Sequence, residues 1–185
     1  MNIHALATGG QKALMAPPGQ GFIYVRSDIL ENMRPVFMGA TSVIEYEHWL
    51  NYNMTPRPGA RRFDLGTPDI VGMAGLLAAV ELLLSLGIEH IADWVTHLSN
   101  TAITDLTARG YHVITPAESA YRANIVTFAY KQDPNRAVER LTANDVTLRA
   151  HEDAAGGHYL RISSHCYNSP DEILRVGETL GENIS

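Results

Sequence analysis

A lysine that follows two glycines and precedes apolar residues is the first candidate for chemistry in this sequence. Lys12 comes directly after Gly9, Gly10 and Gln11 and is followed by the apolar run 13–16. An ammonium group removed from water has a lowered pKa, and the neutral amine attacks carbonyl groups to form Schiff bases. Glycines just before the lysine let the backbone approach a ligand closely. On these local features alone, a solvated surface lysine is the commoner interpretation.

A second candidate lies at the predicted start of a helix. Thr67, Pro68 and Asp69 have the residue types of an N-cap, a first helical position and an acidic first turn, so we expect a helix from Thr67 to about residue 86. The free N–H groups of such an N-terminus favour a bound phosphate. A plain N-cap is the alternative.

A third candidate is an arginine inside a predicted strand. Arg161 lies between Leu160 and Ile162 in the strand expected over 159–163. A guanidinium pairs both oxygens of a carboxylate and stays charged at any working pH, which suits it to holding a substrate carboxylate. A structural ion pair is the alternative.

The remaining reactive side chains suggest less. The eight histidines form no convincing metal constellation, so we expect no metal site. The single cysteine, Cys166, excludes a disulfide framework or a paired-cysteine zinc site, favours a reducing, cytoplasmic setting and is interpreted as structural. His165 could line a site near Arg161. Residues 151–153 could tune specificity or simply form a solvated loop.

Composition narrows the class of protein. The chain has 185 residues, 45% of them hydrophobic and 18% charged, as in a globular protein. Its net charge of -6 argues against a nucleic-acid or anionic-membrane partner. The apolar run 70–88 approaches the length of a membrane span, but Glu81 lies at its middle and Gly72 and Gly75 interrupt it, so we expect a buried core helix. The first ten residues lack the features of a signal peptide.

The patterns predict an α/β protein. Residues 1–30 are expected to form strand, glycine turn, short helix, loop and strand, followed by a helix over 28–33 and a long irregular segment over 34–65, in which 51–62 is an excursion. The helix from Thr67 is followed by a second one over 88–106 that Gly110 ends. Further strands are expected over 111–114, 124–130, 146–149 and 159–163, with helices over 134–141 and 170–180.

Three ordered blocks resemble a known family. Residues 7–25 read ATGGQKALMAPPGQGFIYV, residues 62–72 read RFDLGTPDIVG, and residues 160–169 read LRISSHCYNS. They resemble the lysine segment, the Gly-Thr-Pro segment and the arginine strand-to-turn segment of class V aminotransferases. This family of fold-type I enzymes depends on pyridoxal 5'-phosphate (PLP) and includes cysteine desulfurases and isopenicillin N epimerase-like proteins.

The resemblance implies roles for five residues in binding the cofactor. Lys12 would hold PLP as a Schiff base and then move the α-proton of the substrate. Gln11 stands where many relatives have a cofactor-contacting histidine, and Thr8 is a weaker candidate contact. Gly66 and Thr67 would contact the phosphate across a homodimer interface, from the neighbouring subunit.

The resemblance also implies a substrate site, with one departure from the family pattern. Arg161 would hold the carboxylate of a small amino-acid-like substrate. Cysteine desulfurases carry a nucleophilic cysteine upstream of this arginine, but the matching segment 149–157 has none, and Cys166 lies on the other side. Transamination, or an epimerase- or lyase-like reaction at Cα, therefore fits better than desulfuration through a persulfide.

The resemblance covers only the C-terminal part of the family's chain. We expect the end of the PLP-binding large domain over 1–84 and a small α/β domain over 85–185. The aspartate and ring-stacking residue that contact the pyridine ring in relatives would lie in a missing N-terminal half, leaving an apolar edge and face exposed. A non-catalytic fragment, or half of a split protein that acts only by association, is the alternative from another class.

Overall fold

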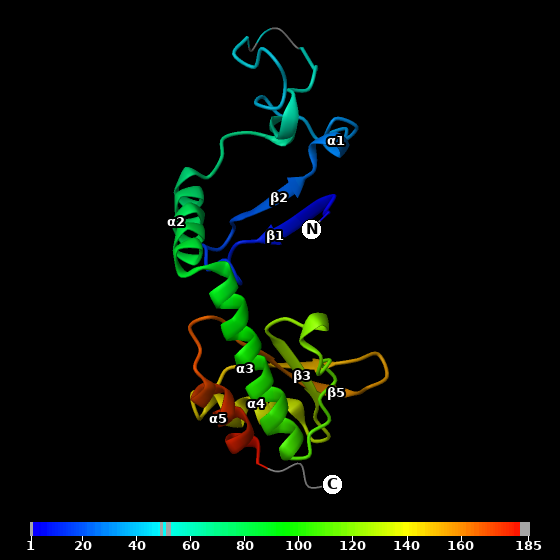
Figure 1. Cartoon of the computed structure of the whole chain (residues 1–185). Coiled ribbons are helices and arrows are strands. Elements are labelled where there is room, and N and C mark those ends of the chain that lie inside the picture. Colours follow the sequence, from blue (N-terminus) through cyan, green and yellow to red (C-terminus); the bar gives the residue numbers. More distant parts are fainter. Residues whose placement is uncertain (1, 49, 51–52, 182–185) are drawn as a thin grey trace. The chain divides into compact units, whose positions relative to one another are not determined.

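The chain divides into two compact units, Met1–Ser85 and Leu86–Ser185, which are described separately. The computed structural model describes residues 2–48, 50 and 53–181, so Asn51 and Tyr52 of the expected excursion lie outside the described residues. Figure 1 shows the order of the elements along the chain. Within the described residues no single helix is long and apolar enough to cross a membrane, and the helices over 70–86 and 88–108 reach that length and composition only as a bent pair.

The first unit is built on a two-stranded antiparallel sheet and one long helix. Its elements are β1 (Ala5–Gly9), β2 (Gly21–Val25), α1 (Ser27–Leu30), the 3-10 helix η1 (Gly59–Phe63) and α2 (Ile70–Leu86). The ladder pairs Ala5 with Val25 and Gly9 with Gly21. The expected short helix between the two strands is wrong, because residues 10–14 form turns there.

The segment between β1 and β2 packs closely on α2. The Gln20 Nε2 donates a hydrogen bond of 2.8 Å to Oδ2 of Asp69, just before the helix. Gly75 allows the contact, since a Cβ at this position would lie 2.6 Å from the rigid ring of Pro17. The lysine-bearing turn is thus fixed against the first half of α2.

Helix α2 begins later than the sequence predicts. Asp69, not Thr67, is the capping residue, because its Oδ1 accepts a hydrogen bond of 3.0 Å from the backbone N–H of Gly72 and its carbonyl accepts one of 2.9 Å from Met73. A carboxylate accepts hydrogen bonds from the free N–H groups at a helix N-terminus as well as a hydroxyl does. Asp69 lies two residues closer to the apolar run than Thr67, so Asp69 caps the helix. The interpretation of Thr67 as the N-cap is therefore wrong.

Much of the first unit's apolar surface is exposed. Helix α2 buries only Gly72, Ala79 and Leu83, so the expectation of a buried core helix is wrong for this chain by itself. The reason is that the two short strands and their loop cover only one side of the helix. The exposed apolar face that the sequence predicted is found here. Its largest members, on β2 and α2, are Phe22, Ile23, Tyr24, Ile70, Val71, Met73, Leu77, Leu82 and Leu84.

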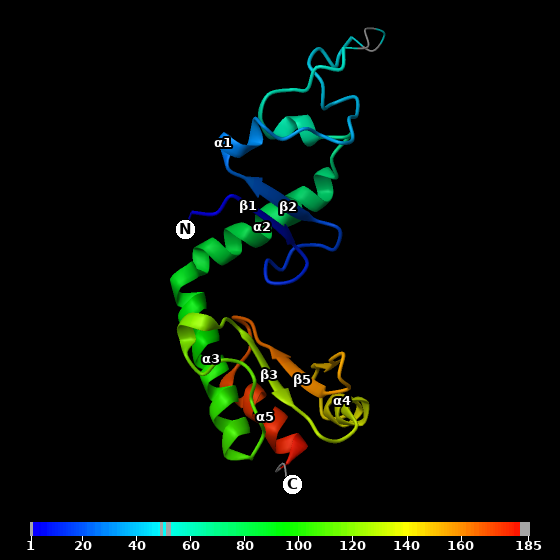
Figure 2. The ribbon, with the colours of Figure 1, turned by 90° about the vertical axis from the view of Figure 1, so that its right-hand side faces the viewer.

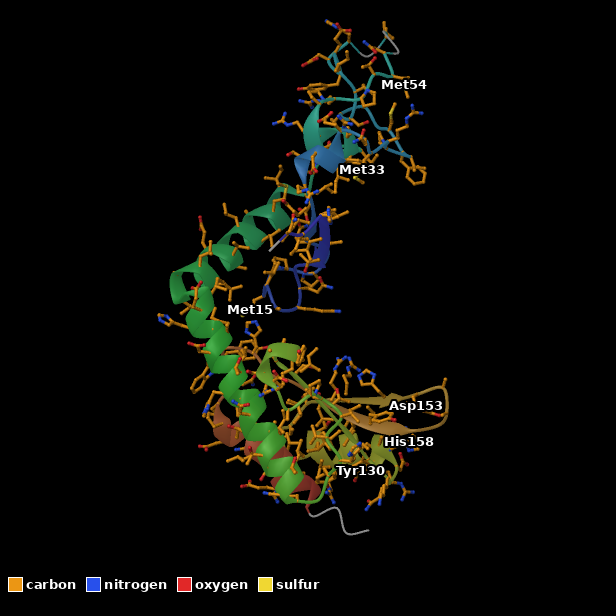
Figure 3. The ribbon with its side chains drawn as sticks, turned by 45° about the vertical axis from the view of Figure 1, so that its right-hand side comes forward. Met15, Met33, Met54, Tyr130, Asp153 and His158 are labelled. Atoms are coloured by element: carbon orange, nitrogen blue, oxygen red, sulfur yellow. The ribbon has the colours of Figure 1, made fainter. Side chains whose placement is uncertain are left out.

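One buried arginine organises the long segment 34–65. The Arg62 side chain is only 8% exposed, and its Nη1 donates to the carbonyls of Leu30, Glu31 and Met33, each at 3.4 Å. The Nη2 donates a hydrogen bond of 2.8 Å to the Glu31 carboxylate. These contacts hold the segment against α1, so the segment is an anchored loop. Figure 3 shows Met33 and Met54 in this part of the unit.

The second unit is a three-stranded antiparallel sheet covered by helices. Its elements are α3 (Ile88–Ala108), the 3-10 helix η2 (Ser119–Tyr121), β3 (Ile125–Ala129), α4 (Pro134–Thr142), β4 (Arg149–Glu152), β5 (His158–Ser163) and α5 (Pro170–Leu180). The strand order is β3-β5-β4, so β5 lies at the centre. The turned view in Figure 2 shows α3, α4 and α5 around this sheet.

The hydrophobic core of this unit lies on one face of the sheet. Strand β5 supplies Leu160 and Ile162 to it, and β3 supplies Val126 and Phe128. The three helices meet them through Leu98, Ala102, Leu106, Ala137, Leu141, Ile173, Val176 and Leu180. Side chains alternate across a strand, so Arg161 and its cross-strand neighbours lie on the opposite face.

Two strands differ from the sequence prediction. The expected strand 111–114 is wrong: it makes only an isolated bridge between Val113 and Phe128, while Tyr111 is buried in the core. The expected strand 146–149 begins only at Arg149, because Leu148 packs into the core before the ladder with β5 starts. In both segments apolar side chains are buried although the backbone that carries them is irregular. The resulting sequence pattern is the same as that of a strand.

We predict that the core face of β5 determines the stability of the second unit. Ile162→Ala, which truncates a buried side chain, should lower the free energy of unfolding by about 2–5 kcal/mol. Ile125→Ala removes the same atoms from the opposite face of β3, where Ile125 is 44% exposed. It should lower the free energy of unfolding by no more than about 1 kcal/mol. Amide hydrogen exchange of β3 and β5 measures both. If the two substitutions lowered the free energy of unfolding equally, the assignment of the core face would be wrong.

We also predict that Arg62 holds the segment 34–65 closed. Arg62→Ala removes the hydrogen bonds to the carbonyls of Leu30, Glu31 and Met33 and the ion pair with Glu31, so chymotrypsin cleavage within this segment should accelerate on the order of tenfold. Arg61→Ala, which removes an exposed neighbouring arginine, is the matched control and should change the rate little. If both variants were cleaved equally fast, Arg62 would not be the anchor.

Candidate active site

Lys12 lies in the turn that joins β1 to β2, and its side chain is exposed. Two backbone hydrogen bonds shape the turn: the Ala16 N–H donates to the Gly10 carbonyl at 2.9 Å, and the Met15 N–H donates to the Lys12 carbonyl at 2.9 Å. This reversal buries Ala16 and leaves the lysine outside. The expected removal of the Lys12 ammonium from water is therefore not found in this chain. Figure 3 shows Met15 in the same turn.

The two other predicted cofactor contacts of this segment lie beside Lys12. Gln11 is exposed, and its side-chain amide lies over Gly9, where an added Cβ would come within 2.8 Å of its Oε1. The Thr8 hydroxyl donates only to the neighbouring Gly9 carbonyl, at 3.3 Å. Both side chains thus present polar atoms to solvent, next to an open hollow lined by residues 7–9 and 19–23.

Gly66 and Thr67 lie in the extended segment before α2, and both are exposed. A Cβ at Gly66 would meet no atom within 4 Å, so the space beside this backbone is open. Because Asp69 caps the helix, a phosphate at Thr67 would be held by the segment's own groups and not by the helix terminus. The helix argument for this contact is lost, and the contact now rests on the family resemblance.

Arg161 belongs to the second unit, at the middle of β5 on the face opposite the core. Its cross-strand partners are Thr127 of β3 and Arg149 of β4. Its Nε is buried and has no hydrogen-bond partner. Arg149 is a further residue at this position that the sequence patterns do not predict, because only the register of the β4–β5 ladder places it opposite Arg161.

Asp153 closes the β4–β5 hairpin. The Asp153 Oδ1 accepts 2.8 Å hydrogen bonds from the N–H groups of Ala155 and Gly157, and its Oδ2 accepts a 2.7 Å hydrogen bond from the Tyr159 hydroxyl. The hydroxyl and these N–H groups hold the pKa of Asp153 below its usual value. The same contact raises the pKa of Tyr159. Figure 3 shows Asp153 and His158 on this hairpin.

The turn after β5 is held by an asparagine. The Asn168 Oδ1 accepts from the His165 N–H at 2.8 Å, and its Nδ2 donates to Glu172 at 3.2 Å. Asn168 therefore has a structural part in this turn. His165 is buried and lies 3.1 Å from the Cys166 sulfur through its Nδ1. The most enclosed cavity nearby, about 150 Å³ between β5 and α5, is lined by none of the predicted site residues.

The described residues include a group suited to covalent attachment of a cofactor and some of the groups that could contact it. An exposed primary amine at Lys12, an amide at Gln11 and open backbone at Gly66 suit an aldehyde that carries a phosphate. In the described part of the chain, no group of three or more histidine, cysteine, aspartate or glutamate side chains could hold a metal ion.

The fold and these segments define a member of the PLP-dependent fold-type I class. The sequence model of the family described as aminotransferase class-V matches residues 1–176. The chain therefore belongs to the class V aminotransferase family, whose members use PLP.

The relatives are mostly described as cysteine desulfurases. A probable cysteine desulfurase of Chlamydia trachomatis is 31% identical over 185 residues, which cover 94% of this chain and 45% of the relative. An uncharacterized aminotransferase of Bacillus subtilis is 26% identical over 92% of this chain and 43% of the relative. The chain thus spans slightly less than half the length of these curated relatives.

Solved structures show the same fold. The apo cysteine desulfurase of Thermococcus onnurineus has a TM-score of 0.83 at 23% identity, covering 96% of this chain and 46% of that one. A complex of the cystine C–S lyase C-DES with cysteine persulfide has a TM-score of 0.81 at 23% identity, with the same two coverages. A mutant of C-DES was solved with glycine covalently linked to its PLP cofactor.

We predict that the Tyr159 hydroxyl is the main cause of the low Asp153 pKa. A carboxylate with a lowered pKa stabilises the hairpin above its unfolded pKa, and this contribution is lost as the pH falls through the folded value. The Asp153 pKa, followed by NMR, should therefore lie below 3.8 in the wild type and rise toward 3.8 in Tyr159→Phe. Tyr121→Phe, at a 73% exposed position, should leave it unchanged. An unchanged pKa in Tyr159→Phe would assign the effect to the backbone N–H groups instead.

Proposed function

We propose that this chain is the C-terminal part of a PLP-dependent enzyme that acts at Cα of an amino acid. The observation that carries the proposal is the exposed Lys12 amine in a turn fixed on α2 by the Gln20–Asp69 hydrogen bond. Bound PLP supplies an electron sink for the negative charge that develops at Cα. Lys12 would hold the cofactor through Nζ, and its free amine would take and return the α-proton of the substrate.

The other predicted residues would bind and orient. Gln11 and Thr8 contact the cofactor from the lysine turn, and Gly66 and Thr67 hold its phosphate from the second subunit of a homodimer. Arg161 would pair with the substrate carboxylate through its guanidinium group. The first unit would thus be the end of the large cofactor-binding domain and the second the small domain.

The hairpin at β4–β5 favours transamination, or an epimerase- or lyase-like reaction at Cα, over desulfuration through an enzyme-bound persulfide. Its turn carries no thiol, and Asp153 closes it through bonds to Ala155, Gly157 and Tyr159. Elimination at Cβ, transamination and epimerisation all start with removal of the α-proton and need no such thiol. Likeness to desulfurases and to a C–S lyase supports a sulfur-containing amino acid as the substrate.

The active enzyme would need a further polypeptide. The chain spans 45% of the first relative's length, and the exposed apolar side chains of β2 and α2 offer a surface that such a polypeptide would cover. The residues that contact the pyridine ring would belong to it. The alternative from another class is a chain that keeps this fold and acts only by association; the same exposed surface favours it.

We predict that PLP attaches selectively to Lys12. When the chain is incubated with PLP and reduced with borohydride, peptide mass spectrometry should find the label on Lys12 at least about tenfold more often than on Lys131, equivalent to ~1.4 kcal/mol of preference. Lys131 is the matched control because it is the only other lysine and is also exposed.

Two variants sharpen this test. Lys12→Arg should abolish the selective label, whereas Lys131→Arg should leave the label on Lys12 unchanged. Equal labelling of the two lysines in the wild type would contradict the proposed role of Lys12 in this chain and favour the association-only alternative.

A further inference from the structure

Two arginines face each other across the centre of the second unit's sheet. The ladder between β4 and β5 pairs Arg149 directly with Arg161, and the next pair along it, Ala150 with Leu160, points into the core. Side chains of a direct antiparallel pair project from the same face, with Cβ atoms about 5 Å apart. Both guanidinium groups therefore extend from the face opposite the core.

Among the described residues of this unit, no carboxylate forms an ion pair with either guanidinium. Among the described residues, the ion pairs involve other arginines, at positions 26, 62, 109 and 136. The carboxylate of Asp153, at the turn end of the same hairpin, is occupied by the hairpin N–H groups and by Tyr159. On the other side of Arg161, the cross-strand neighbour is the uncharged Thr127.

This arrangement costs stability unless an anion is bound. Like charges directly opposite each other destabilise a sheet, and the buried Nε of Arg161 has lost water without gaining a hydrogen bond. One carboxylate balances one of the two positive charges. A ligand with two acidic groups balances both, and its second group would lie on the β4 side of Arg161, because β3 offers no charge.

We propose that Arg149 and Arg161 form a paired anion site that selects amino-acid substrates with a second acidic group in the side chain. Arg161 binds the α-carboxylate, a step that rests on the proposed function, and Arg149 binds the acidic side chain. Arg149 is thereby a specificity-determining residue. A substrate with an uncharged side chain would leave its guanidinium unmatched, so among the sulfur-containing amino acids proposed above the pair favours those that also carry an acidic side-chain group.

The test is an NMR titration of the whole chain without cofactor. The probes are succinate, which carries two carboxylates, and butyrate, which has the same chain length and one. Chemical shifts of the β4 and β5 amides report binding in the wild type, in Arg149→Gln and in Arg161→Gln. Arg136→Gln is the control, since Arg136 is an 86%-exposed arginine on α4 of the same unit.

We expect succinate to bind the wild type more tightly than butyrate. Arg149→Gln should weaken succinate binding about tenfold and change butyrate binding by less than about twofold, while Arg161→Gln should weaken both. Arg136→Gln should change neither. If succinate bound no better than butyrate, or if Arg149→Gln weakened both probes equally, the second-acid site would be wrong and the two arginines would share one carboxylate.

This outcome is independent of the cofactor chemistry. Succinate binding that depends on Arg149, together with unselective labelling of Lys12, would support the anion site and contradict the proposed enzyme. Selective labelling of Lys12 without an effect of Arg149→Gln would do the reverse.

Discussion

The strict alternation of side chains along β5 is the constraint on which the second unit depends. Leu160 and Ile162 must face the helices, because they fill the core together with residues of β3. Arg161 is then forced onto the other face, and a slip of one residue would bury its charge. The core thus positions the arginine without touching it. The strand that gives the unit its stability also fixes the direction in which its most important polar side chain points.

The first unit follows a different principle, because its reactive residue lies on a turn and not on a regular element. Lys12 is held by hydrogen bonds of the turn and by packing of the following residues on α2, at Pro17 and Gly75. Close contact between turn and helix requires a residue without a side chain at Gly75. The exposed apolar face on the remaining sides of α2 is the surface on which a larger domain would be built.

The sequence predicted the elements whose ends carry local signals and missed those whose burial comes from tertiary contacts. Helix α5 begins with a capping box of Ser169 and Glu172 after a clear strand, and both were predictable. The loop conformation at Tyr111 could not be predicted, because an apolar loop residue that is buried in the core gives the same sequence pattern as a strand residue. The solvent exposure of Lys12 agrees with the interpretation that its local features favoured. Motif resemblance identified the family; the pairing of Arg149 with Arg161 needed the register of the sheet.

Arg62 has a consequence for how freely this sequence can diverge. Four of the five hydrogen bonds of its side chain go to main-chain carbonyls, those of Leu30, Glu31, Met33 and Gly59, which every amino acid supplies, and only Glu31 contributes a side chain. The anchor therefore constrains the path of the backbone at residues 30–33 and leaves the residue types there nearly open. Substitutions, and even changes of length between residues 34 and 61, are expected to accumulate among homologues faster than changes at Arg62, because loop closure depends only weakly on length.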